Sequence, residues 1–321
     1  MGTAYAAGMR IWHDRCLLNL RRYQKRAPYG GKHFRKECNM TTATEVKKEK
    51  SSSNKGRGLT GEAEKLNNVK RVIAIMSGKG GVGKSLVTGL LASSLRRTGQ
   101  EVGVLDADIT GPSIPKMFFS NGVRLEFSPL AMVPAKTTTG ISVMSVNLLL
   151  ESEDQAVIWR GPLISNLIRQ FWTDVVWGDL DYLLVDLPPG TSDASLTVLQ
   201  SLPMSAVILV TSPQNLARMV VRKAAQMVRH IEIPILGLLE NMSYFVCPDT
   251  GSHHKIFGSG NPELMAAELH MPFLGRLPID PSIASLCDSG RIEQYPGDLF
   301  RSISQRIVDL APVARPPKIK K

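Results

Sequence analysis

Compact apolar runs alternate with longer stretches of helical spacing between residues 71 and 280. Each run ends in polar or glycine-rich residues, which is typical of buried parallel strands. We predict strands at 71–76, 101–108, 181–190, 205–213, 233–243 and 273–280. Apolar residues recur at helical spacing between these runs, which predicts helices at 85–99, 162–176, 192–202 and 215–230.

This alternation predicts an α/β fold with a mainly parallel sheet and helices on both faces. Ligands of such sheets bind at the carboxyl ends of the strands, so the polar strand ends should gather in one place. No internal repeat or boundary interrupts residues 68–312, and we expect one domain there. Residues 1–67 form a basic tail that we expect to be disordered, and 313–321 form a short basic tail.

The net charge of +11 comes mainly from the N-terminal tail. Of the 39 basic and 28 acidic residues, 16 and 6 lie in residues 1–70, which leaves 23 basic and 22 acidic residues in the remainder. A basic face for nucleic acid is therefore not indicated. No apolar run approaches the roughly 18 residues of a membrane-spanning helix, so stable membrane insertion is not expected.

The N-terminal tail and the cysteines leave the compartment open. The tail is a solvated segment, a transit peptide, or an upstream stretch before a true start at Met40. Four scattered cysteines do not make a disulfide framework, so we expect a reducing compartment. The cytoplasm is the default expectation, and a mitochondrial location is the alternative if residues 1–40 are a transit peptide.

A phosphate-binding loop follows the first strand. Its residues fit G-x-x-x-x-G-K-[ST] and read Gly78, Lys79, Gly80, Gly81, Val82, Gly83, Lys84 and Ser85. Glycines let backbone N–H groups face phosphates, and the following helix directs its positive dipole end at them. We expect Lys84 to reach the β- and γ-phosphates of a nucleotide and Ser85 to ligate Mg²⁺.

The second lysine of the loop, Lys79, resembles the early lysine of the MinD/NifH/ArsA/ParA ATPase superfamily. That resemblance implies an ATP-sandwich homodimer in which Lys79 contacts the partner's nucleotide. A cation supplied in trans stabilises charge on the transferring phosphoryl group, as an arginine finger does. The alternative interpretation is a solvated lysine.

Three acids follow predicted strands. Asp186 in DLPPG is suited to hold Mg²⁺ through water. By resemblance, Asp108 orients the attacking water and Asp106 helps around Mg²⁺. Each acid alone could cap a helix, but the set is typical of a nucleotide site. Where another strand ends, Asn241 is interpreted as an adenine contact rather than a turn residue, and Pro213 and Gln214 as residues that flank the base.

Further motifs narrow the resemblance to one branch. They are LDADITGPSIPKM (105–117), IWRGP (158–162), DYLLVDLPPGTSDASL (181–196), VTSPQ (210–214), LLENMSYFVCP (238–248) and IFGSG (256–260). Together they resemble the Mrp/ApbC-type P-loop ATPases, which include the Nbp and Ind-type proteins, over about residues 68–312. The resemblance implies an ATP-hydrolysing homodimer that carries an iron–sulfur cluster to apo-proteins, with the cluster held by a C-P-x-C pair from each subunit.

The chain departs from that pattern at its cluster motif. Cys247 is followed by Pro248, Asp249 and Thr250, so Thr250 stands where the second ligand cysteine is expected. A [4Fe–4S] cluster normally takes four thiolates, and a dimer offers only two copies of Cys247. Replacement ligands remain open, and the candidates are Asp249, His253, His254 and Cys287. Cys287 is also interpreted as a small buried thiol, and the two histidines as exposed loop residues.

Three functions compete at this point. The first hypothesis is an ATP-dependent iron–sulfur carrier. The second is a MinD/ParA-like regulatory ATPase without a cluster, for which we expect a basic amphipathic C-terminal helix. The segment 298–321 disfavours it, because prolines interrupt the helix before the basic residues. The third is a nitrogenase-reductase-like electron donor, which would use Cys247 and Cys287 as its ligand pair.

Overall fold

The computed structural model describes residues 66–109, 111–120, 122–123, 125–127, 131–149 and 161–312. Most of the predicted N-terminal tail lies outside the described residues, as do Met40, Cys16 and Cys38. The C-terminal tail at 313–321 and positions 158–160 of the IWRGP motif also lie outside them. Apart from Phe127, the described residues belong to one compact unit, and the fold below is that of this unit.

Within the described residues, six strands are five residues or longer and the others are shorter. The strands are β1 (Asn68–Val69), β2 (Val72–Ser77), β3 (Val102–Asp106), β4 (Glu126–Phe127), β5 (Met132–Val133), β6 (Ala135–Lys136), β7 (Ser142–Met144), β8 (Asp179–Leu180), β9 (Tyr182–Asp186), β10 (Ala206–Thr211), β11 (Ile235–Val246), β12 (His253–His254) and β13 (Phe273–Ile279).

Helices fill most of the connections between these strands. They are α2 (Lys84–Arg97), α3 (Ile114–Phe118), α4 (Gly161–Thr173), α5 (Asp193–Ser201), α6 (Asn215–His230), α7 (Pro262–Glu268), α8 (Pro281–Asp288) and α9 (Asp298–Leu310), with 3₁₀ turns η2 (Val146–Leu149) and η3 (Ile292–Gln294).

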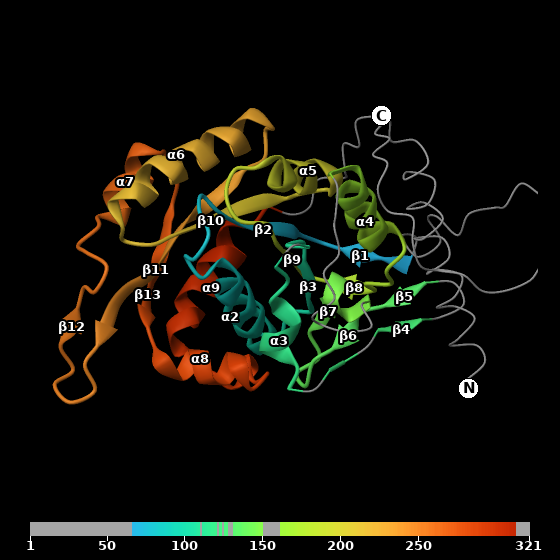
Figure 1. Ribbon diagram of the computed structural model, residues 1–321, viewed down its shortest axis with the longest axis horizontal. Coiled ribbons are helices and arrows are strands. Elements are labelled where there is room, and N and C mark those ends of the chain that lie inside the picture. Colours follow the sequence, from blue (N-terminus) through green and yellow to red (C-terminus); the bar gives the residue numbers. More distant parts are fainter. Residues whose placement is uncertain are drawn as a thin grey trace, which may run out of the picture. The chain divides into compact units, whose positions relative to one another are not determined.

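Nine strands form the main sheet, in the order β12-β11-β10-β2-β9-β3-β7-β6, with β13 also paired to β11. The pairs among β2, β3, β7, β9, β10, β11 and β13 are parallel, and β12 and β6 join antiparallel. This confirms the predicted parallel α/β fold. Helices α4, α5 and α6 lie along one face of the sheet and α2 and α9 along the other (Figure 1).

The central strands are buried along their whole length. Every residue of β2, β3, β9 and β10 is buried, because parallel strands covered by helices on both faces have no solvent side. Their apolar runs are the signal that located them in the sequence. Burial of these runs removes apolar surface from water at about 25 cal/mol per Å², which is the main stabilisation of the sheet.

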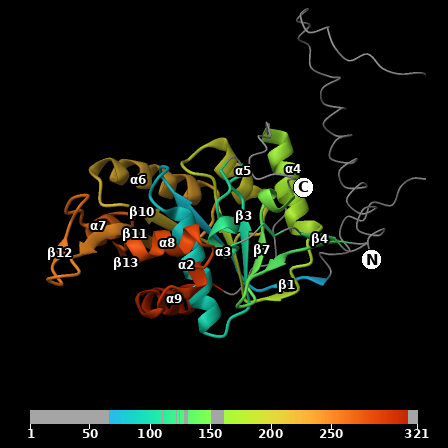
Figure 2. The ribbon, with the colours of Figure 1, turned by 60° about the horizontal axis from the view of Figure 1, so that its bottom comes forward.

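The C-terminal helix α9 packs on the body through its apolar face. Its buried residues are Phe300, Ile303, Ser304 and Ile307, and the Ser304 hydroxyl lies 2.9 Å from the Ser94 hydroxyl of α2. The helix is therefore occupied by intramolecular packing, as Figure 2 shows from a second direction. Among the described residues, none of the helices combines the length and apolarity that a membrane crossing requires.

Candidate functional site

The loop between β2 and α2 lies at the carboxyl end of the central strand. Helix α2 begins at Lys84, directly after Gly83, whose φ is 75°. A left-handed φ of this size favours glycine, which explains the residue type at the turn into the helix. The first N–H groups of α2 have no partner within the helix and therefore face whatever anion enters the loop.

Two glycines of this loop are required by close neighbours. A Cβ on Gly78 would lie 2.7 Å from the Val220 carbonyl carbon of α6, and a Cβ on Gly83 would lie 2.3 Å from Asn241 Nδ2. Asn241 is 3% exposed, and its Nδ2 donates to the Val82 carbonyl at 2.9 Å. Segments far apart in sequence therefore hold the loop in its conformation.

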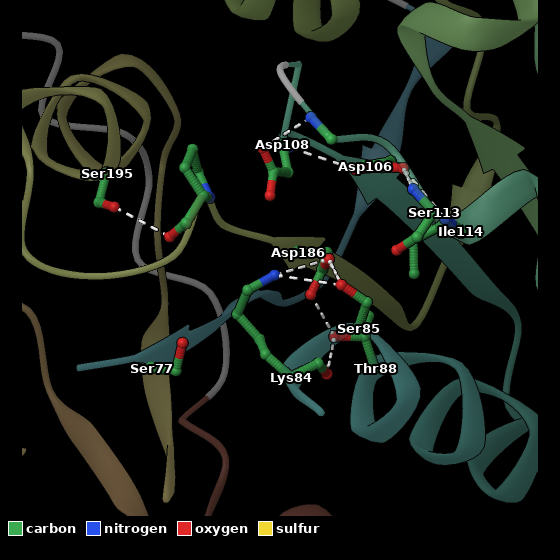
Figure 3. A network of polar contacts seen from close by, with 12 residues as sticks. Ser77, Lys84, Ser85, Thr88, Asp106, Asp108, Ser113, Ile114, Asp186 and Ser195 are labelled. Atoms are coloured by element: carbon green, nitrogen blue, oxygen red, sulfur yellow. Dashed lines mark hydrogen bonds and ion pairs between the residues drawn. The ribbon is translucent and has the colours of Figure 1, made fainter. Parts of the chain in front are cut away.

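Three side chains of α2 converge on the carboxylate of Asp186 (Figure 3). Lys84 Nζ lies 2.7 Å from Asp186 Oδ2, the Ser85 hydroxyl donates to Oδ2 at 2.5 Å, and the Thr88 hydroxyl donates to Oδ1 at 2.7 Å. Lys84 and Asp186 are both buried. Because the carboxylate keeps a cation and two hydroxyl donors, its burial is compensated.

Asp106 lies beside Asp186 at the ends of two neighbouring strands. The two residues are paired in the register of β3 and β9, and both are buried. Asp106 accepts hydrogen bonds from the backbone N–H groups of Asp108, Ser113 and Ile114. Burial, and next the Asp186 carboxylate, raise the pKa of Asp106 to about 8.

Asp108 lies beyond the strand that was predicted to contain it. Strand β3 ends at Asp106 rather than at 108, because the Asp106 carboxylate binds the following backbone and bends the chain away from the sheet. Asp108 accepts from the N–H of Gly111 through its carboxylate at 3.2 Å. Figure 3 shows its side chain on the Asp186 side of this turn, half-exposed at the strand-end cluster.

Lys79 and Gln214, both predicted site residues, contact one another. Lys79 Nζ donates to the Gln214 side-chain oxygen, and Gln214 is exposed at the start of α6. Pro213 before it is buried, and its carbonyl lies 3.1 Å from the position of a Cβ on Gly260. The end of β10 therefore lies next to the phosphate loop and to the IFGSG segment.

The DLPPG segment is fixed at both of its ends. The Gly190 N–H donates to the Ser77 carbonyl at 3.1 Å. The buried Ser195 hydroxyl, from α5, lies within hydrogen-bond distance of the carbonyls of Pro188 (3.0 Å) and Gly190 (3.1 Å). This segment connects the Asp186 carboxylate to α5 and borders the phosphate loop.

Asn241 does not end its strand, contrary to the prediction. Strand β11 continues to Val246, because antiparallel pairing with β12 extends it beyond the parallel sheet. Asn241 is therefore in the interior of β11. Met242 after it has a left-handed φ of 59°, which interrupts the extended backbone conformation within the strand.

Cys247 is at the tip of the hairpin made by β11 and β12. Its N–H donates to the Ser252 carbonyl at 2.9 Å, and its carbonyl accepts from Gly251 at 2.8 Å. The Thr250 hydroxyl, and next the backbone N–H groups of Thr250 and Asp249, lower the pKa of the Cys247 thiol. Thr250 stands at the position where the resemblance led us to expect a second ligand cysteine.

Of the candidate replacement ligands, Asp249, His253 and His254 lie in the Cys247 hairpin and Cys287 lies outside it. His253 and His254 are exposed, and the His253 ring stacks on Tyr244 at a centroid distance of 4.5 Å. Cys287 is half-buried in α8, which Figure 1 places away from β12, and burial raises the pKa of its thiol. Among the described residues of one chain, no three Cys, His, Asp or Glu side chains form a metal-binding group.

Sequence reasoning missed Thr88 and Ser195. Thr88 lies four residues after Lys84, so both are on the same face of α2, and that spacing was the available signal. Ser195 offered no comparable signal, because its carbonyl partners depend on how the DLPPG segment folds. Among the residues that were predicted, Asp106, Asp186 and Gln214 lie next to the phosphate loop. Cys247 lies in a separate hairpin.

A glycine loop between a buried parallel strand and a helix, with acids at the neighbouring strand ends, defines a P-loop nucleotide-binding protein. Residues 68–310 match the ParA family model described as the NUBPL iron-transfer P-loop NTPase. The chain belongs to this family.

Individual relatives agree with this assignment. An iron–sulfur cluster carrier protein of Methanocaldococcus jannaschii is 45% identical over 251 residues, which cover 77% of this chain and 87% of the relative. A carrier protein of Clostridium perfringens is 43% identical over 235 residues, 71% of this chain and 82% of the relative. The family resemblance found in the sequence is therefore confirmed.

Solved structures are similar as well. The nucleotide-binding protein of Archaeoglobus fulgidus, in complex with ADP, is 42% identical, with a TM-score of 0.67 over 76% of this chain and 96% of that chain. The cell division ATPase MinD of Pyrococcus furiosus has a TM-score of 0.53 at 20% identity, over 75% of this chain and all of that chain. The second similarity supports the fold alone.

Proposed function

We propose that this chain binds and hydrolyses ATP at the phosphate loop and carries an iron–sulfur cluster to apo-proteins. The observation that supports nucleotide chemistry best is the convergence of Lys84, Ser85 and Thr88 on Asp186. An ammonium, a hydroxyl and a carboxylate at a helix N-terminus are the groups that a triphosphate and its metal ion require.

Each polar group of the loop has a role in this proposal. Glycines 78, 80, 81 and 83, with Val82, supply backbone N–H groups for the phosphates, and Lys84 neutralises the β- and γ-phosphates. Ser85 and Asp186 would hold Mg²⁺, because both present the oxygen donors that this ion prefers. When bound, Mg²⁺ neutralises charge on the phosphate oxygens.

The two acids of the β3 end have separate roles. Asp108, half-exposed in its turn, would orient the attacking water. Asp106 holds the turn through three backbone N–H groups and helps to shape the region around Mg²⁺. Asn241 would contact the adenine edge, and Pro213 and Gln214 would flank the base. The strand-end position of Gln214 beside the loop is consistent with its role.

Lys79 is proposed to act across a homodimer. It is a half-buried lysine whose ammonium binds Gln214 of its own chain. In a face-to-face dimer this ammonium would instead reach the partner's nucleotide and stabilise charge on the transferred phosphoryl group. Exchange of a neutral amide partner for a phosphate is electrostatically favourable, so the contact with Gln214 does not oppose the proposal.

The cluster is the cargo of the proposed reaction. The relatives from M. jannaschii and C. perfringens are iron–sulfur cluster carriers by name, and Cys247 is a half-exposed thiol at the tip of the β11–β12 hairpin. Two chains would contribute two Cys247 thiolates. The other positions of a [4Fe–4S] cluster would be filled by His253, His254, Asp249 or an external thiol.

The proposed function requires a reducing compartment, because the cysteine ligand must stay reduced. The cytoplasm meets this requirement, and so does the mitochondrial matrix. A regulatory ATPase without a cluster is the competing function, and the absence of a second cysteine at Thr250 is the observation that favours it.

Anaerobic reconstitution with iron and sulfide separates the two functions. We expect the wild-type chain to gain the broad charge-transfer absorbance of an iron–sulfur cluster and to hydrolyse ATP. Cys247→Ser should lose the absorbance and retain ATP binding, whereas the matched control Cys287→Ser should retain both. A chain that hydrolyses ATP and remains colourless after reconstitution would refute the carrier and leave the regulatory ATPase.

A further inference from the structure

Strand β11 contacts the phosphate loop in its interior and leads directly into the cysteine hairpin. Asn241 Nδ2 donates to the Val82 carbonyl at 2.9 Å. The same strand ends at Val246, and Cys247 is the next residue. Figure 1 shows β11 running from the sheet out to the hairpin that ends in β12. One continuous strand therefore joins the nucleotide loop to the proposed cargo thiol.

The loop end of this connection is tightly packed. Asn241 is 3% exposed, and a Cβ on Gly83 would lie only 2.3 Å from its Nδ2. When phosphates engage the N–H groups of the loop, the Val82 carbonyl cannot shift without moving or releasing the Asn241 amide, because close-packed interiors transmit displacement. A nucleotide-dependent displacement of the loop would therefore first move the Asn241 side chain.

The strand has a bend directly after this contact. Met242 has a φ of 59°, a conformation that L residues other than Asn and Asp seldom adopt and that recurs in switch regions. The pairing of β11 with β13 is also interrupted, with a register shift between Glu240 and Tyr244. The pairing of β11 with β13 is therefore interrupted around Met242 and resumes beyond it, where Tyr244 and Phe245 pair with Pro278 and Ile279.

The hairpin beyond the bend is held together as a unit. The Tyr244 ring stacks on His253, Phe245 and Val246 pair with β12, and the Cys247 N–H donates to the Ser252 carbonyl. A rotation at Met242 would therefore move Cys247 together with the hairpin and with the end of β13 that pairs with it. The Cys247 side chain is half-exposed, so a thiol reagent can reach it and report a change in its surroundings.

We propose that β11 transmits the nucleotide state of the phosphate loop to the Cys247 hairpin, with Asn241 as the positioning residue and Met242 as the hinge. This inference rests on the proposed function, since it makes ATP control the exposure of the cargo thiol. The ligand that drives the change is a nucleoside triphosphate or diphosphate in the loop, and the responding group is the Cys247 sulfur.

The test measures the reaction rate of Cys247 with an aromatic disulfide reagent. The full chain carries Cys16→Ser, Cys38→Ser and Cys287→Ser, so that Cys247 is its only thiol. Rates are measured without nucleotide, with Mg·ADP and with a Mg-bound non-hydrolysable ATP analogue, and nucleotide saturation is measured in the same samples. We expect the analogue to change the rate by about fivefold or more, the lower end of coupling between sites.

Two variants locate the transmission in β11. Met242→Gly relaxes the hinge. In this variant nucleotide should still bind, but the reaction rate of Cys247 should be nearly the same with and without nucleotide. Asn241→Ala removes the contact with Val82 and should have the same effect at saturating nucleotide. The matched control is Glu232→Gly, because Glu232 has the same φ of 59° in an exposed turn outside β11 and should keep the full response.

The outcomes separate this inference from the function on which it rests. The response should be equal at protein concentrations tenfold apart, because transmission within one chain does not depend on dimerisation. A chain that binds nucleotide with no change in thiol rate refutes the inference alone, as does a full response in Met242→Gly. A chain that binds no nucleotide refutes both the inference and the proposed function.

Discussion

The Lys84 ammonium and the Asp186 carboxylate form a buried ion pair, with Nζ and Oδ2 2.7 Å apart. Asp186 is the last residue of β9, and Lys84 is the first residue of α2. The pair therefore joins the sheet to the helix that follows the phosphate loop. It also places the proposed phosphate-binding cation and the proposed metal-binding acid in contact, so a change in one affects the other.

Removal of Lys84 should reduce both stability and nucleotide affinity. Loss of one partner leaves a buried carboxylate without its cation, which costs about 3–5 kcal/mol, and the remaining Ser85 and Thr88 donors place the expected cost near the lower value. Nucleotide affinity should fall about tenfold to a hundredfold with loss of one charge-assisted contact. Chemical denaturation and fluorescent-nucleotide titration of Lys84→Ala measure the two effects.

Lys70→Ala is the matched control for that variant. Lys70 forms an ion pair of the same length, 2.7 Å, with Asp181, but the two side chains are 55% and 21% exposed. Such surface pairs contribute less than about 1 kcal/mol, and Lys70 lies outside the site. If Lys84→Ala lowers the free energy of unfolding no more than Lys70→Ala does, the Lys84 ammonium does not stabilise the buried Asp186 carboxylate.

Gly83→Ala should disrupt the phosphate loop by a clash as well as by backbone strain. Gly83 has a φ of 75°, and its Cβ would meet Asn241 Nδ2 at 2.3 Å. Gly99 has a φ of 87° and nothing within 4 Å of its Cβ, so Gly99→Ala should show the strain alone, about 1–2 kcal/mol. We expect a larger loss of stability in Gly83→Ala, with nucleotide affinity lost in that variant and unchanged in Gly99→Ala.

The stability of the chain should depend on pH through Glu240 in β11. Burial raises the pKa of Glu240, and Ser243 and Arg276 oppose the shift. Because the folded state holds the proton more tightly, this contribution to stability is complete below the ordinary pKa and is lost as pH rises through the raised value. Relative to Glu240→Gln, the free energy of unfolding should therefore fall with rising pH over that window and then level off.

Denaturation series at several pH values, run in parallel on the chain and on Glu240→Gln, measure this difference. The subtraction removes the contributions of all other groups, including Asp106. A difference that rises with pH, or that stays flat, would show that burial does not dominate at Glu240.

Thr250→Cys should strengthen cluster binding. It restores the second thiolate of the C-P-x-C pattern, so that a dimer offers four thiolates to a [4Fe–4S] cluster. We expect more iron and sulfide per chain after anaerobic reconstitution and slower loss of absorbance in the presence of a chelator. Thr250→Val, which has nearly the same shape and no thiol, is the control and should not gain cluster. Equal retention in the two variants would contradict a ligand role for this hairpin.

The central sheet could be predicted from the sequence because strands that are buried on both faces have continuous apolar sequences. Strands β3, β9 and β10 lie within their predicted segments, and β2 ends at Ser77, one residue beyond the predicted 71–76. Helix α6 has the predicted bounds of 215–230. The phosphate loop was equally readable, since its glycines and Lys84 stand in a local spacing. These features depend on residues that are close together in the sequence, so a single sequence is enough to predict them.

The remaining features depend on contacts between distant segments. The continuation of β11 past Asn241 needs the pairing with β12, and the end of β3 at Asp106 needs the backbone N–H groups of Ser113 and Ile114. The contact of Asn241 with Val82 joins residues 159 positions apart. No local pattern encodes such partners, so the coupling strand and the hinge at Met242 emerged only with the fold.

Cluster transfer is the most direct test of the central claim. The reconstituted chain is mixed anaerobically with an apo-ferredoxin, and arrival of the cluster on the ferredoxin is followed with Mg·ATP, with a non-hydrolysable analogue and without nucleotide. The account predicts transfer that is faster with hydrolysable ATP than with the analogue, and loss of this difference in Lys79→Ala. Hydrolysis of ATP by a reconstituted chain that delivers no cluster under any of the three conditions would contradict it.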